Sequence, residues 1–182
     1  MIRALVLTLL TAMGCARPPA PPAAAADPVP ADGSARTVRS IEEHRFLQYG
    51  VATHIDAPPD QVWAVLVDAT RYPEWNSTIV SLDGDIAADG RIRLVSTLDP
   101  KRTFKLQIST FEPPSSLVWE DGNAMFRGVR TFTLTPEDSG TRFEMKEAMT
   151  GTMLKMIAPK LPDFAPSFEA FARDLKAEVE KG

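Results

Sequence analysis

Alternation of apolar and polar residues begins near Phe46 and continues through most of the chain, which predicts a domain made mainly of strands. Residues 47–56 alternate well enough for one strand. Six further strands are expected at residues 79–82, 92–98, 104–111, 117–121, 126–136 and 141–150. Turn-forming stretches, among them DGD, LDPK, EPPS, EDGN and EDSG, separate these strands. The pattern therefore predicts one strand, an interruption, and a series of antiparallel hairpins.

Two segments show helical spacing instead. The interruption at residues 57–69 opens with Pro59 and Asp60, which suit the first turn of a helix. A second apolar stripe, at steps of four, three and four residues, consists of Phe164, Phe168, Phe171 and Leu175. The prolines around this stripe place the final helix at residues 166–181, with a short helical piece at 153–157 before it.

Hairpin registers predict which side chains share a face of the sheet. Counting outward from each turn gives Arg130 with Glu147 and Phe132 with Met145 in the last hairpin, Trp119 with Phe126 in the middle one, and Ile108 with Trp119 in the first. The three hairpins agree on one apolar surface. The stripe of the final helix is expected to cover it.

Arg130 and Glu147 are the exception on this surface, because the register places two charged residues among Phe, Met and Trp. Burying two charges in a dry core costs several kcal/mol per ion, so the pair indicates a hydrated or ligand-filled cavity between sheet and helix. A register error of one residue is the alternative, since it would turn both side chains to solvent.

Composition narrows the class of partner. The chain has 182 residues and a net charge of -4, with no Lys/Arg cluster, so it lacks the electrostatic surface that nucleic acids require. Only His44, His54 and Cys15 could supply an imidazole or thiolate ligand, and no spaced acidic cluster suggests a carboxylate site, so no metal site is expected. There is no glycine-rich phosphate loop and no G-x-S-x-G sequence, and no cofactor is predicted.

The N-terminus has the layout of a secretory signal at residues 1–14, with one basic residue and then an apolar run. TAMGC resembles a bacterial lipobox, which predicts lipidation of Cys15 and an exported, membrane-anchored lipoprotein that faces the periplasm. Ordinary cleavage after Gly14, giving a soluble secreted or periplasmic protein, is the alternative. The Ala/Pro-rich composition of residues 16–31 predicts a disordered tether, which would extend from the lipidated residue to residue 45.

The element order and the stretch IDAPPDQVWAVLVDATRYPEWN resemble the START-like polyketide cyclase and dehydrase superfamily, also called SRPBCC, over residues 46–181. The matching residues are Ile55, Ala57-Pro58-Pro59, Val62-Trp63, Asp68, Tyr72-Pro73, Trp75 and the EAMTG stretch at 147–151. Many relatives carry a proline shortly after the tryptophan, where this chain has Asn76 and Ser77.

This resemblance implies an α+β helix-grip fold in residues 46–182, in which a curved seven-stranded antiparallel sheet wraps around the long C-terminal helix and a deep apolar cavity. Two small helices would follow the first strand and close one end, with Tyr72, Pro73 and Trp75 as a rigid aromatic plug. The residues expected at the cavity are Arg130, Glu147, Trp119, Phe126, Phe104, Leu106, Ile108, Phe132, Met145, Met149, Phe168, Phe171, Tyr72 and Trp75.

Three functions stay open at this point. The first is a monomeric, membrane-tethered binding or carrier protein for a hydrophobic small molecule such as a lipid, an isoprenoid or a polyketide-like compound. The second is an enzyme, a cyclase, dehydratase or hydrolase, with Glu147 as its only candidate catalytic residue, because an apolar cavity would raise the pKa of a carboxyl. Arg130 beside it would oppose that shift and favours orientation of a polar head group. The third is an interaction module with a filled core.

Overall fold

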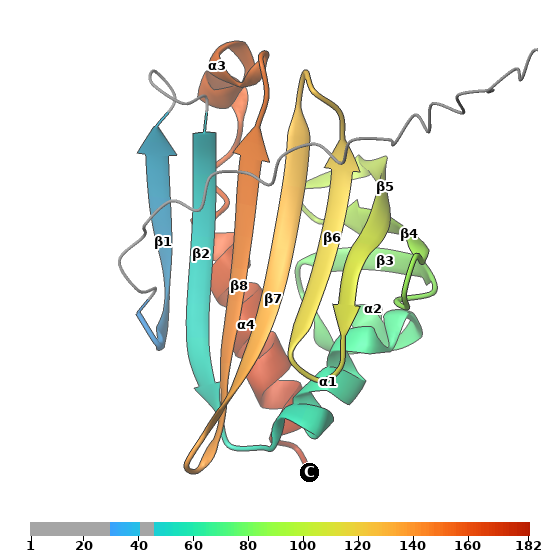
Figure 1. The fold of residues 1–182 in the computed structure, drawn as a ribbon, viewed down its shortest axis with the longest axis vertical. Coiled ribbons are helices and arrows are strands. Elements are labelled where there is room, and N and C mark those ends of the chain that lie inside the picture. The colour runs from blue at the N-terminus through green and yellow to red at the C-terminus, as the bar shows by residue number, and fades with distance from the viewer. Residues whose placement is uncertain (1–29, 41–45) are drawn as a thin grey trace, which may run out of the picture.

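The computed structural model of the chain describes residues 30–40 and 46–182, which form one antiparallel sheet curved around the helix α4 (Figure 1). The eight strands are ordered β1-β2-β8-β7-β6-β5-β4-β3. They are β1 (Asp32–Ser40), β2 (Phe46–Ile55), β3 (Ile79–Gly84), β4 (Arg91–Ser96), β5 (Asp99–Glu112), β6 (Ser116–Gly122), β7 (Arg127–Glu137) and β8 (Gly140–Thr150). The predicted helix-grip fold is confirmed, with one strand more than expected.

The additional strand is β1, which corrects the prediction of a disordered tether over residues 32–40. Asp32–Ser40 pairs antiparallel with β2, and Ala35 lies opposite Val51. Without it, β2 would leave a row of backbone donors and acceptors unpaired at the sheet edge. The sequence DGSARTVRS has no apolar alternation, so pattern reasoning could not find this strand. The predicted signal peptide, Cys15 and residues 16–29 of the Ala/Pro-rich segment lie outside the described residues.

Short helices close one end of the sheet. α1 (Pro59–Val67) begins at Pro59, as predicted, and buries Val62, Trp63 and Leu66. The 3₁₀ turn η1 (Ala69–Arg71) leads directly into α2 (Tyr72–Trp75). Both small helices lie near the C-terminal end of α4, whereas α3 (Leu154–Ile157) and the following 3₁₀ turn η2 (Ala158–Lys160) lie at the opposite end (Figure 1).

The long helix α4 (Ala165–Val179) crosses the concave face of the sheet (Figure 1). The residues that it buries are Phe168, Phe171, Ala172, Leu175 and Val179, which confirms three members of the expected stripe. The fourth, Phe164, is the N-cap residue just before the helix and is half-buried. Within residues 30–40 and 46–182, no helix combines the length and the apolar character needed to span a bilayer.

Candidate functional site

The central strands align four residues in one row across the concave face. Trp119 lies opposite Arg130, Arg130 opposite Glu147, and Glu147 opposite Tyr49. Directly opposed residues of antiparallel strands point to the same face. Because Trp119 and Tyr49 are fully buried under α4, Arg130 and Glu147 also point inward. The predicted register of the last hairpin is therefore confirmed, and the one-residue slip did not occur.

One predicted register was wrong. Trp119 was expected opposite Phe126, whereas the structure closes the β6–β7 loop so that Gly122 pairs with Arg127. The loop is tighter and lies farther along the chain, because Gly122 adopts a φ of 93° and the Asn123 side chain accepts a hydrogen bond from the Met125 backbone. The shift is an even number of residues, so the assignment of faces survived the error.

Arg130 and Glu147 form a two-donor ion pair. Nε and Nη2 of Arg130 donate to the same oxygen, Oε2 of Glu147, at 2.7 and 2.5 Å. The side chains are 24% and 18% exposed, so solvent reaches both. The guanidinium also lies 5.3 Å from the ring centroid of Phe168 on α4, in cation-π contact. The pair thus joins the sheet to the N-terminal half of the helix.

A cavity of about 300 Å³ lies beside this pair, between the concave face and the N-terminal end of α4. Its apolar wall consists of Ile79, Leu94, Leu98, Phe104, Leu106, Trp119, Phe126, Met149, Leu161, Pro162, Phe164 and Phe168. Its polar groups are Thr78, Ser96, Asp99, Arg102, Asp121, Arg130, Glu147 and Ser167. The interior is therefore not solidly packed, and eight of the fourteen predicted residues line the cavity: Arg130, Glu147, Trp119, Phe126, Phe104, Leu106, Met149 and Phe168.

Asp121 is the functional candidate that the sequence did not reveal. It follows Trp119 by two positions on β6, so it points to the same face, but its place in the turn-like stretch EDGN hid it. Burial raises the pKa of Asp121, and the negative charge of Glu147 raises it further. Arg102, a hydrogen bond from the Gly128 backbone, and Arg130 act in the opposite direction.

Gly128 makes room for the two carboxyl groups. It lies opposite Asp121 on β6 and Met149 on β8. A Cβ at this position would come within 3.0 Å of Oδ1 of Asp121 and 3.7 Å of Oε1 of Glu147. The missing side chain therefore leaves a space in the cavity wall that both carboxyl groups border.

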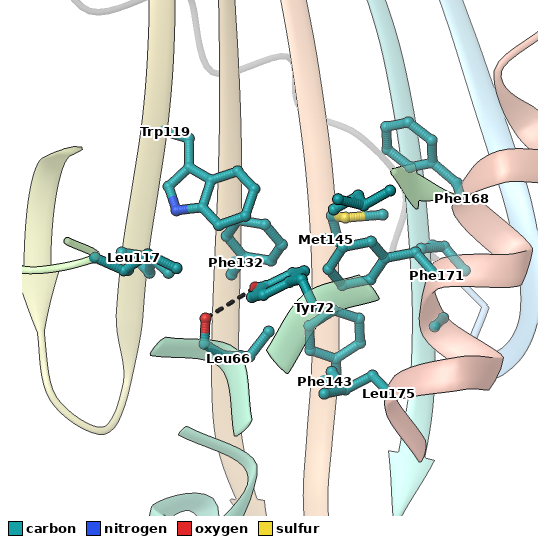
Figure 2. Packing of buried hydrophobic residues seen from close by; sticks show 14 of the residues in the cluster. Leu66, Tyr72, Leu117, Trp119, Phe132, Phe143, Met145, Phe168, Phe171 and Leu175 are labelled. Carbon is teal, nitrogen blue, oxygen red and sulfur yellow. Dashed lines mark hydrogen bonds between the residues drawn. The ribbon is translucent and has the colours of Figure 1, made fainter. Parts of the chain in front are cut away.

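The other six predicted residues do not line the cavity; they belong to the packed core. They are Ile108, Phe132, Met145, Phe171, Tyr72 and Trp75, all of them buried. Figure 2 shows Tyr72, Phe132, Phe143 and Phe171 gathered between sheet and helix. At this end of the interior the rings of Tyr72, Phe132, Phe143 and Phe171 pack against one another.

Tyr72 and Trp75 form the aromatic plug expected from the sequence. Their ring centroids are 4.7 Å apart, and both rings contact Phe171 on α4. Tyr72 donates a hydrogen bond of 2.8 Å to the carbonyl oxygen of Leu66, which ties α2 back to α1 (Figure 2). Burial raises the pKa of Tyr72, so its hydroxyl remains a donor in this contact. Its role is structural closure.

Among the described residues, no group of three or more His, Cys, Asp or Glu side chains is placed to hold a metal ion. His54 lies at the far end of β2, where it contacts Glu137 at 2.7 Å and Asp56 at 3.0 Å, away from the cavity.

Solved structures share this fold. A protein from Rhodobacter sphaeroides is 22% identical, with a TM-score of 0.58, and the match covers 81% of this chain and 98% of that one. A START superfamily protein from Mycobacterium smegmatis is 18% identical, with a TM-score of 0.54 and coverage of 74% and 97%. The di-domain ARO/CYC StfQ from the steffimycin biosynthetic pathway is 14% identical, with a TM-score of 0.59 and coverage of 77% and 54%.

At these identities the likeness shows the fold alone. No curated protein matches the chain. The family model described as polyketide cyclase / dehydrase and lipid transport matches residues 48–180, which is most of the chain and nearly the whole of the described domain. The chain therefore belongs to the polyketide cyclase / dehydrase and lipid transport family.

Proposed function

We propose that this domain binds a small hydrophobic molecule that carries a polar group. The observation that carries the proposal is the apolar cavity with Arg130, Glu147 and Asp121 in its wall. Charged groups beside an empty, dry cavity would be costly, whereas a ligand with a hydrogen-bonding group would both fill the cavity and pair with them. Apolar walls with a few converging polar groups are typical of small-molecule sites.

The cavity volume limits the size of the buried part of the ligand. At about 300 Å³ it is roughly twice the 150 Å³ that suffices for benzene in an engineered cavity. A two-ring compound or a short acyl or isoprenoid chain fits this volume. A long-chain lipid would have to leave part of its length outside.

The polar group of the ligand is expected to lie at the ion pair. Arg130 uses two donors on Oε2 of Glu147, and a guanidinium has five. Oε1 of Glu147 borders the space at Gly128 together with Asp121. A carbonyl or hydroxyl group placed there has both a cationic donor and carboxyl acceptors within reach.

Filling the space at Gly128 tests the proposal. Gly128 does not adopt a positive φ, so Gly128→Val is compatible with its strand conformation, and the clashing Asp121 oxygen is the end of a flexible side chain. We expect this variant to fold and to lose binding of an apolar fluorescent probe by at least about tenfold, because the added methyl groups occupy the cavity.

Thr131→Val is the matched control, because Thr131 lies on the same strand at a position that faces away from the cavity. Native mass spectrometry of the purified wild-type chain should also detect a co-purifying small molecule. If the wild type binds neither probe nor ligand, or if Gly128→Val binds as well as Thr131→Val, the proposal is wrong.

A second candidate function, proton-transfer catalysis, is favoured by the raised pKa of Asp121. A carboxyl group that retains its proton near an apolar substrate can act as a general acid. Glu147, the candidate from the sequence, is engaged by two hydrogen bonds from Arg130, so it is better placed to orient a substrate.

The family and the likeness to an ARO/CYC protein make polyketide-like compounds the substrates to test. Loss of turnover in Asp121→Asn with binding retained would support this function, whereas turnover lost only in Glu147→Gln would support the original assignment.

The proposal also includes a membrane tether, which the sequence of residues 1–15 supports. Export and acylation of Cys15 would hold a monomeric domain at a periplasmic membrane surface, because several acyl chains anchor a protein stably. Membrane fractionation and intact mass of the wild type and of Cys15→Ser test this. An unmodified, soluble wild-type chain would instead indicate ordinary signal cleavage.

A further inference from the structure

The sheet forks between β5 and β6. The last paired residues of these two strands are Gln107 and Glu120. Beyond that point residues 99–106 of β5 pair only with β4, and Asp121 and Gly122 of β6 pair only with β7. The backbone hydrogen bonds that close the rest of the sheet are therefore missing at this place.

The fork brings the cavity into contact with a groove on the convex face of the sheet. This groove has a volume of about 560 Å³ and is bordered by β3, β4, β5, β6 and the start of β7. Cavity and groove share two lining residues, Leu106 on β5 and Asp121 on β6. At the fork, only the side chains of Leu106 and Asp121 therefore separate the cavity from the groove.

The groove holds four cationic side chains and three carboxyl groups, and three of the cations lie together on β4 and β5. Arg93 lies between the buried residues Ile92 and Leu94, so it points outward, and Lys105 is its neighbour across the β4–β5 pair. Arg91 lies two positions before Arg93 and is also exposed. Two-residue spacing puts Arg91 and Arg93 on the same face of β4, and direct pairing with Arg93 puts Lys105 on that face of β5.

In the described part of the chain these three cations form no ion pair, although the carboxyl group of Asp83 on β3 lies across from Arg93 in the β3–β4 register. Among residues 30–40 and 46–182, none of them forms a hydrogen bond or ion pair with another side chain. The fourth cation, Arg127, donates to Glu120 at 2.6 Å. The other carboxyl groups of the groove are Asp83 on β3 and Asp121 at the fork itself, so unpaired cations outnumber unpaired carboxyl groups.

We propose that the fork is a lateral opening of the cavity, and that the ligand is an amphiphile whose apolar part lies inside while its anionic head group lies in the groove at Arg91, Arg93 and Lys105. The inference rests on the proposed function and adds the chemical class of the ligand. A carboxylate or a phosphate suits the groove, because guanidinium and ammonium groups bind both through charge-assisted hydrogen bonds. The cavity is too small for a long amphiphile, and the groove provides space for the remainder.

Three probes with the same chain test the proposal: decanol, decanoate and decyl phosphate. Binding to the full wild-type chain is measured by calorimetry and by the change in tryptophan fluorescence, since Trp119 is the one of the three tryptophans that lines the cavity. We expect the two anionic probes to bind about tenfold more tightly than decanol at low salt, and this advantage to shrink as NaCl is added, because salt screens exposed charges.

Charge-neutralising variants locate the head group. Arg93→Gln/Lys105→Gln should lose most of the anionic advantage, about tenfold, and bind decanol as the wild type does. Lys155→Gln/Lys160→Gln is the matched control, since both lysines are exposed on the α3 and η2 segment and lie outside the groove. It should bind all three probes unchanged. All these side chains are exposed, so the variants are expected to fold.

The outcomes separate this inference from the proposed function. If no probe binds, the proposed function itself is wrong. If decanol binds but the anionic probes gain nothing, or if their gain survives in Arg93→Gln/Lys105→Gln, the lateral opening is wrong while the cavity remains a binding site. If only decyl phosphate depends on the groove, the head group is a phosphate; if decanoate also does, a carboxylate is sufficient.

Discussion

The same strands and the same helix α4 enclose a packed core at one end of the domain and a cavity at the other. Toward α1 and α2, the row that contains Leu117, Phe132 and Met145 is buried and packs against Phe171. Two residues farther along each strand, Arg130 and Glu147 form an ion pair beside a cavity. A distance of two residues along each strand thus separates the packed core from the cavity.

This contrast shows that the hollow depends on a few side chains and not on a different backbone architecture. Phe132 is followed on the concave face of β7 by Arg130 and then by Gly128. Along β7 the large ring of Phe132 fills the space under α4, whereas the charged Arg130 and then Gly128, which has no side chain, leave it open. A charged pair resists dehydration, and a glycine cannot fill volume, so both keep this end of the interior open.

The largest expected effect is the difference in stability between truncations at the two ends. Phe171→Ala removes a ring that contacts the rings of Tyr72, Trp75 and Phe132, and it should lower the free energy of unfolding by about 3–5 kcal/mol. Phe126→Ala, in the half-buried cavity wall, should cost about 1 kcal/mol, because little packing is lost. Urea denaturation measures both. Equal costs would contradict the division into a filled and a hollow end.

The plug at the filled end provides a second test. Tyr72→Phe keeps the ring but leaves the buried carbonyl of Leu66 without its donor, so the free energy of unfolding should fall by about 1–3 kcal/mol. Thr70→Val removes an exposed hydrogen bond to Asp68 nearby and should change stability by less than about 0.5 kcal/mol. If both variants unfold at the same urea concentration, the hydrogen bond does not hold the plug.

At the hollow end, the ion pair is expected to matter less for stability than a dry buried pair would. Arg130→Met leaves Glu147 without its partner and should cost about 1–2 kcal/mol, below the range for fully buried pairs, because solvent reaches both side chains. The double variant Arg130→Met/Glu147→Gln should recover part of this loss. A cost as large as that of Phe171→Ala would indicate that the cavity excludes water.

The smallest expected effect is the pH dependence of Asp121. In the folded protein its pKa is raised, whereas an unfolded aspartate has a pKa of about 3.9. Between these two values the folded state holds the extra proton, so wild-type stability falls as the pH rises through this window. Asp121→Asn has no carboxyl group to ionise, so this fall in stability is absent and the melting temperature should be about 1–2 °C higher at pH 7. The gain should vanish below about pH 4, and a gain that persists there would have another cause.

The sequence by itself determined the hairpins, the faces of the strands and the stripe of α4. The pair of Arg130 with Glu147 and the pair of Ile108 with Trp119 were both predicted correctly, because turn length and two-residue alternation are local properties of the chain. Even the wrong partner for Trp119 kept the correct face. The resemblance added the closed aromatic plug at Tyr72 and Trp75.

Only the tertiary structure decided which inward residues line a cavity. Phe132 and Trp119 have the same pattern in the sequence, yet only Trp119 borders the hollow. β1 forms because the edge of β2 is open, and Asp121 borders the cavity because Gly128 lies opposite it. The fork exists because β5 separates from β6 beyond Gln107 and continues only beside β4. Each of these depends on the curvature of the whole sheet and on the distance to α4, which arise from contacts between residues far apart in the chain.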